Sequence, residues 1–159
     1  MLKKKEKTRR IYGNCLCIII AAVFLDQFIK LIIRTSFNLN ESLILIRNFL
    51  NITYITNTGS AFGILKGANT YLIFFSLIVL GLLMFYWNKI KEKEKIFFSL
   101  IIGGIIGNLI DRIFLGHVVD FISFSFWPAF NVADSCLTIG IIGLIILSFK
   151  EWCFHRFSL

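Results

Sequence analysis

The chain has 159 residues, of which 57% are hydrophobic and 16% aromatic, with a formal net charge of +8 and a mean hydropathy of +0.81. This apolar content is too high for a soluble domain of the same size, so the composition indicates a polytopic membrane protein. The basic residues cap apolar runs in short clusters at 3–10, 89–95 and 150–156. This distribution excludes a nucleic-acid-binding surface and, by the positive-inside rule, places the clusters in the cytoplasm against anionic membrane lipids.

The first apolar run begins near Ile11 and stays uncharged only to Leu25. A spanning helix takes about twenty residues, so this one must continue through Asp26 and Lys30, and we place it at about 12–35. Asp26 and Lys30 are four residues apart, which brings their side chains together on one face of a helix. The pair either neutralises itself near the membrane interface or also supports a neighbouring site.

A polar and mixed segment follows at about 37–67. Residues 43–46 and 49–55 are rich in β-branched and aromatic side chains, and the glycines after residue 57 are typical of turns. Open sheet edges are not tolerated in hydrocarbon, so we expect a small sheet at or above the membrane interface.

Three further spans are predicted at about 68–88, 96–115 and 131–149. Four spans put both termini on one side, which agrees with the three basic clusters. The sequence therefore predicts an all-α membrane protein: a single four-span domain over residues 1–159 with a small extracytoplasmic β-sheet between the first two helices.

The four aspartates fall in one layer near the extracytoplasmic surface when depth is counted at about 1.5 Å per residue. A carboxylate costs on the order of 2.5–3.5 kcal/mol at the centre of a membrane helix, so each needs an explanation. Asp111 is most simply the counter-ion of Arg112, and Asp134 follows Asn131 at the spacing of a capping box. Asp120 has no evident cationic partner.

Asp120 and Asp134 are separated by a turn containing Pro128, which could fold one acid back against the other. Two carboxylates held close together cannot both ionise, so one keeps its proton. The ionised acid can then take a proton from water while the neutral acid hydrogen-bonds the carbonyl under attack. Such an aspartic dyad hydrolyses peptides without a covalent intermediate, a metal or a cofactor.

Five motifs in chain order extend this interpretation: DQFIK from Asp26, NTGSAFG from Asn57, GGIIGNLIDR from Gly103, VVDF from Val118 and FNVAD from Phe130. With them, nearly the whole chain resembles the lipoprotein signal peptidases (signal peptidase II), bacterial four-span aspartic proteases of the inner or cytoplasmic membrane. The resemblance implies that Asp120 and Asp134 are catalytic. It also implies dyad-supporting or substrate-binding roles for Asn57, Gly59, Asn108, Asp111, Arg112 and Asn131, and structural support from Asp26 and Lys30. Ser60 departs mildly from the family pattern, where many members have a small apolar residue.

The resemblance further implies removal of the signal peptide from diacylglyceryl-modified prolipoproteins, with cleavage on the amino side of the lipidated cysteine. The sheet would correspond to the family's cradle resting on the membrane, and the cyclic peptide globomycin would be an inhibitor. We expect a monomer with no cofactor and no metal, both termini cytoplasmic and the active site near the extracytoplasmic face.

Two other functions fit a small four-span protein. A proton-coupled transporter would place its acids near the midplane, with access from both faces. A purely structural membrane subunit does not require acidic residues to cluster in one layer. The single outer layer of aspartates favours the protease over both alternatives.

Overall fold

The computed structural model describes residues 2–59 and 67–157, without the side chains of residues 2–5, 7–9, 155 and 157. Ser60 and the turn glycine at 63 lie outside the described residues. The described elements are α1 (Leu2–Ser36), β1 (Ser42–Ile46), β2 (Leu50–Asn57), α2 (Asn69–Tyr86), the short 3-10 helix η2 (Trp87–Lys89), α3 (Lys95–Phe114), β3 (Val118–Phe124), β4 (Trp127–Phe130) and α4 (Val132–Phe157).

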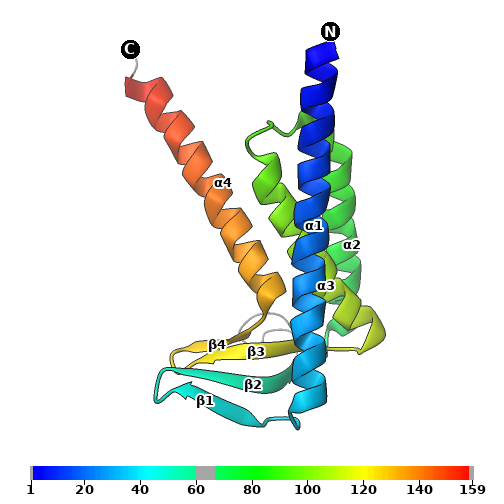
Figure 1. The fold of residues 1–159 in the computed structure, drawn as a ribbon, viewed down its shortest axis with the longest axis vertical. Helices are drawn as coiled ribbons and strands as arrows, with labels where there is room; N and C mark the ends of the chain where they lie inside the picture. Colours follow the sequence, from blue (N-terminus) through cyan, green and yellow to red (C-terminus); the bar gives the residue numbers. More distant parts are fainter. Residues whose placement is uncertain (1, 60–66, 158–159) are drawn as a thin grey trace.

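Four helices in the described part of the chain are long and apolar enough to cross a membrane, and the predicted fold class is confirmed. The apolar segment of α1 covers Arg10–Ser36, so this helix does continue through its charged turn. Figure 1 shows both chain termini at one end of the helix bundle and the sheet across the other end. The expectation that the termini share one side therefore holds for the fold.

The sheet is antiparallel throughout, with the strand order β1-β2-β3-β4. Its first two strands come from the predicted segment between α1 and α2, and its last two come from the connection between α3 and α4. The sequence did not reveal β3, because Val118–Phe121 are buried on both faces of the sheet and show no alternation of apolar and polar residues. The connection that carries Asp120 is thus part of the sheet.

Helix α3 packs against each of the other three helices. Its glycines permit this close packing: a Cβ on Gly107 would lie 2.7 Å from Asp26 Oδ2 on α1 and 3.1 Å from Ala133 Cβ on α4. A Cβ on Gly104 would overlap the carbonyl oxygen of Ala133. The small face of α3 therefore draws α1 and the first turn of α4 together at the depth of the acids.

The sheet is fastened to the helices by a small apolar core of Ile33, Val119 and Phe121. Ile33 lies near the end of α1, and the other two flank Asp120 on β3. A register shift in the β2–β3 pairing between Ile52 and Ile55 then sets Ile55 opposite Asp120. The core and the shifted register together fix Asp120 against the end of the helix bundle that carries the sheet.

Candidate active site

Asp120 is buried on β3, and both of its carboxylate oxygens accept hydrogen bonds. Asn57 Nδ2, at the end of β2, lies 3.1 Å from Asp120 Oδ2, and Asn131 Nδ2 lies 2.7 Å from Oδ1. The side chain of Asn57 is itself held, because its Oδ1 accepts a hydrogen bond from Gly59 N at 2.9 Å. The orientation of the Asp120 carboxyl is therefore set from two sides.

Asp134 lies in the first turn of α4, and Asn131 is the residue that precedes this helix. Asn131 Oδ1 accepts a hydrogen bond from Asp134 N at 2.9 Å, and Asn131 N donates to Asp134 Oδ2 at 3.3 Å. This reciprocal pair is the predicted capping box, with Asp in place of the usual Glu or Gln. Asn108 Nδ2 on α3 donates to Asp134 Oδ1 at 2.8 Å, so this carboxylate also has a partner at each oxygen.

Asn131 joins the two acids. Its side chain is fully buried, and its amide nitrogen contacts Asp120 while its amide oxygen caps the helix that carries Asp134. The same nitrogen lies 3.1 Å from Asn108 Oδ1, which links Asn131 to the second asparagine at the site. A single side chain thus connects the Asp120 carboxyl to the first turn of α4.

Beside the two acids lies a cluster of buried charges, Asp26, Lys30 and Asp111, which we call the buried charge cluster. Lys30 Nζ lies 2.8 Å from Asp26 Oδ2 and 3.0 Å from Asp111 Oδ2, and all three side chains are at most 2% exposed. Lys30 Nζ also donates to Asn108 Oδ1 at 3.0 Å. Because the ammonium takes the amide oxygen of Asn108, the amide nitrogen of that residue is turned toward Asp134.

The prediction that Asp111 is the counter-ion of Arg112 is wrong. Consecutive residues on a helix point to different faces, so Asp111 turns toward Lys30 on α1 while Arg112 turns toward the sheet. Arg112 Nη2 donates to Gly59 O at 3.3 Å. The ion pair predicted between Asp26 and Lys30 is present, and it is shared with Asp111.

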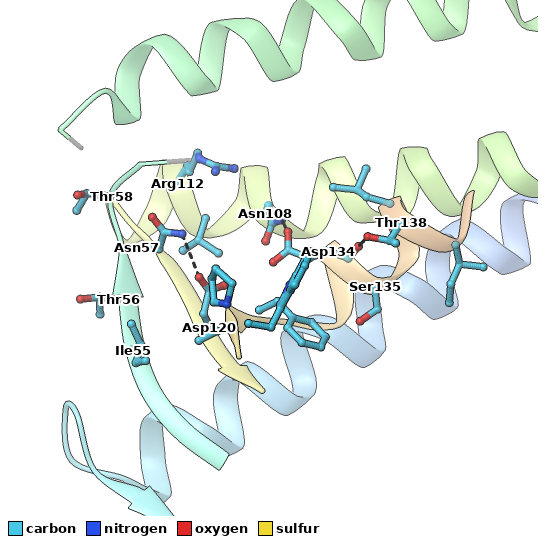
Figure 2. A pocket seen from close by; sticks show the side chains of 17 residues that line it. Ile55, Thr56, Asn57, Thr58, Asn108, Arg112, Asp120, Asp134, Ser135 and Thr138 are labelled. Atoms are coloured by element: carbon cyan, nitrogen blue, oxygen red, sulfur yellow. Dashed lines mark hydrogen bonds between the residues drawn. The ribbon is translucent and has the colours of Figure 1, made fainter. Parts of the chain in front are cut away.

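The two acids line one cavity of about 950 Å³, bounded by β2, β3, β4, α3 and α4 (Figure 2). Apolar side chains dominate its walls, among them Trp127 and Phe130 on the strand side and Leu137 on α4. The polar side chains in the wall include Asn57, Asn108 and Arg112, in addition to the two acids. The cavity can therefore take a largely apolar molecule with a polar group presented to the acids.

The environment of Asp120 favours its neutral form. Burial, together with the neighbouring charge of Asp134, raises the pKa of the Asp120 carboxyl to about 7, against the opposing effect of the hydrogen bonds from Asn57 and Asn131. A carboxyl with a pKa near neutrality can hold a proton at rest and release it during a reaction. Together with a second acid in the same cavity, it can perform general acid–base chemistry on a bound polar bond.

Sequence reasoning missed one residue at this site. Gln27 on α1 donates through Nε2 to Asp111 Oδ1 and to Gly107 O, each at 3.0 Å. It lies within the DQFIK motif, but it carries no charge and shows no informative spacing. Among the described residues, no group of three or more His, Cys, Asp or Glu side chains is arranged to hold a metal ion.

Comparison with known proteins gives a consistent result. Residues 18–150 match the sequence model of a family described as signal peptidase (SPase) II. Proteins named lipoprotein signal peptidase are similar over most of their length. The protein from Halothermothrix orenii is 38% identical, and the match covers 84% of this chain and 94% of that protein. The protein from Nostoc punctiforme is 42% identical, and the match covers 82% of this chain and 85% of that protein. The protein of that name from Staphylococcus aureus strain JH9 is 39% identical over 87% and 90%.

Solved structures agree with the sequence comparisons. A structure described as a bacterial membrane enzyme superposes with a TM-score of 0.83 at 38% identity, covering 87% of this chain and 89% of the solved one. A second structure with the same description has a TM-score of 0.80, also at 38% identity, covering 87% of this chain and 94% of the solved one. The similarity therefore extends from the motifs to the arrangement of helices and sheet.

The raised pKa of Asp120 predicts how stability depends on pH. A carboxyl whose pKa rises from 3.8 in the unfolded chain to about 7 in the fold binds its proton more tightly when folded, so its contribution is complete below pH 4 and is lost as the pH rises through 7. We expect the Asp120→Asn variant to lack this contribution, which is on the order of a few kcal/mol. Thermal unfolding of the wild type and the variant in detergent between pH 4 and 8 measures this contribution. If the melting temperatures of the two proteins changed with pH in the same way, the raised pKa of Asp120 would be contradicted.

Proposed function

The chain belongs to the signal peptidase II family, and on this basis we propose that it is an aspartic endopeptidase in which Asp120 and Asp134 are the catalytic pair. As a multi-pass bacterial membrane protease of this family, it removes signal peptides from prolipoproteins. Family membership does not support the transporter alternative. The observation that carries the catalytic assignment is that both carboxylates line one cavity and are joined through Asn131.

The proposed reaction uses the two acids in different protonation states. Asp134 lies in the first turn of α4, where the helix dipole favours negative charge, and its carboxylate takes a proton from the attacking water. Asp120, with its raised pKa, donates a hydrogen bond to the oxygen of the scissile carbonyl. Water oxygen bonds to the carbonyl carbon, and the tetrahedral intermediate breaks at the C–N bond as the departing nitrogen receives a proton from the pair.

The surrounding polar residues support this chemistry in the proposal. Asn57, Asn108 and Asn131 orient the two carboxylates through the hydrogen bonds described above. Arg112 faces the cavity and is held by Gly59, which suits it to bind a carbonyl group of the substrate. The buried charge cluster of Asp26, Lys30 and Asp111 is the structural support beside them.

The substrate proposed is a prolipoprotein whose cysteine already carries diacylglycerol, cut on the amino side of that cysteine. The largely apolar cavity wall suits such a lipopeptide, and the apolar four-helix surface suits membrane lipids. We further propose that the protein acts as a monomer, that it needs no cofactor and that globomycin occupies this same cavity.

The proposed orientation puts both termini in the cytoplasm and the sheet on the extracytoplasmic side. Basic residues gather at the end of the bundle that carries the termini, as the positive-inside rule requires. A reporter enzyme that is active only in the cytoplasm should therefore work when fused after residue 159. If the same reporter were active only when inserted in the β1–β2 turn, the sheet would lie in the cytoplasm and the proposed orientation would be wrong.

Substitution of either acid tests the catalytic pair. Asp120→Asn and Asp134→Asn keep the shape of the side chain but remove the shared proton and the base, so we expect cleavage of a diacylglyceryl-modified substrate to fall at least about a thousandfold. Purified variants should elute as folded protein in detergent, with near-normal melting temperatures above pH 7, where protonation of Asp120 no longer adds stability to the wild type. Turnover close to that of the wild type in either variant would exclude the aspartic dyad.

The role of Asn131 can be separated from its helix cap. Serine is also a good N-cap, so Asn131→Ser should keep α4 stable to within about 1 kcal/mol. It cannot reach Asp120 with a donor, and loss of the hydrogen bond that orients the Asp120 carboxyl should lower kcat by about tenfold to a hundredfold. Kinetic and melting measurements on the one variant test both statements. A variant that melts normally and cleaves normally would show that Asn131 only caps the helix.

A further inference from the structure

Two carboxylates beside the catalytic pair each anchor one element of the site. Asp26 Oδ1 on α1 accepts a hydrogen bond from Ala133 N at 2.8 Å, and Ala133 is the residue before Asp134. Asp111 Oδ2 on α3 accepts one from Val119 N at 3.0 Å, and Val119 is the residue before Asp120. The separation of Asp26 and Asp111 therefore helps to set the separation of the two catalytic acids.

Gln27 and Lys30 tie these two anchoring carboxylates together. Lys30 Nζ bridges Asp26 Oδ2 and Asp111 Oδ2. Gln27 Nε2 bridges them a second time, at 3.2 Å from Asp26 Oδ2 and 3.0 Å from Asp111 Oδ1. Its third contact, with the carbonyl of Gly107, holds the amide over the point where α1, α3 and α4 meet.

A neutral donor is well suited to this second bridge. A single positive charge already lies between two carboxylates, so the cluster has a formal net charge of −1, and its acids still have oxygens that need donors. An amide nitrogen supplies two hydrogens, one of which two of the three acceptors of Gln27 must share, and it adds no charge next to the catalytic pair. A residue that could only accept hydrogen bonds would repel both carboxylates.

We propose that Gln27 is a positioning residue that holds Asp26 and Asp111 at a fixed separation and thereby sets the spacing of Asp120 and Asp134. The inference rests on the proposed function, in which these two acids are the catalytic pair. Gln27 touches neither of them, so it acts through the backbone amides of Ala133 and Val119.

The spacing of the pair has a measurable consequence. Two acids that share a proton titrate in two steps, and the gap between the steps grows as the acids come closer. The active form carries one proton, so the gap sets the width of the bell-shaped pH profile. Without the Gln27 bridge the two acids can move apart, so the gap between their titration steps shrinks and the pH profile becomes narrower. A loss of folded protein would instead lower the whole curve without changing its width.

The experiment compares wild type, Gln27→Met and Gln27→Glu in cleavage of a lipidated substrate across pH. Gln27→Met has a similar length but no donor, and we expect kcat to fall by about tenfold to a hundredfold with KM within about threefold and a narrower bell. Gln27→Glu has the same shape but places an acceptor against two carboxylates. Its deficit should therefore be largest at high pH and should shrink at low pH, where the new carboxyl gains a donor proton.

Ser99→Ala is the matched control. Ser99 is fully buried on the same helix as Asp111 and donates to Lys95 O at 2.7 Å, at the end of α3 far from the acids. The substitution removes a buried hydroxyl from α3 without touching the cluster, so kcat per folded enzyme and the width of the bell should stay unchanged whatever its effect on the melting temperature.

The outcomes separate this inference from the proposed function. A wild-type kcat and bell width in Gln27→Met, or an equal drop in both Gln27 variants at every pH with unchanged width, would overturn the positioning role. If Gln27→Met does not fold, the pH dependence of Gln27→Glu decides alone. Failure of the dyad itself would appear elsewhere, as retained cleavage in Asp120→Asn or Asp134→Asn.

Discussion

The structure depends on a lysine ammonium buried between two carboxylates. Lys30 contacts Asp26 on its own helix and Asp111 on α3, inside a bundle whose outer surface is apolar. Removing one partner from such a group leaves an uncompensated buried charge, which is strongly destabilising. The cluster therefore holds α1 and α3 in one register, and its two carboxylates also accept hydrogen bonds from other elements.

The same two carboxylates explain how a strand-borne acid and a helix-borne acid are held near each other. Asp111 accepts from the backbone of β3, and Asp26 accepts from the first turn of α4. Each contact lies one residue before a proposed catalytic aspartate. The glycines of α3 are part of the same arrangement, because a side chain at Gly107 would occupy the space taken by the Asp26 carboxylate. The close packing of the helices and the position of the Asp26 carboxylate therefore depend on the same glycine.

Asn131 shows that one residue can cap a helix and also contact the candidate site. Its capping box with Asp134 forms as the spacing predicted, and the same amide also donates to Asp120. Asp134 therefore completes a helix cap and faces the cavity at once. Asn131 lies between β4 and α4, and its cap holds its side chain in a fixed orientation relative to the helix. The amide nitrogen of the same side chain is therefore held where it can contact Asp120.

The sequence by itself determined the four spans, the membrane class, the ion pair at a spacing of four residues and the capping box, because each depends on local periodicity or on short-range spacing. Only the tertiary structure decided that Asp111 pairs with Lys30 instead of its neighbour Arg112, that the segment around Asp120 is a strand of the same sheet, and that Gln27 belongs to the site. These features depend on contacts between residues about sixty to eighty-five positions apart. No local pattern encodes them, since a buried strand shows no alternation and a neutral amide has no charge pattern to reveal its partner.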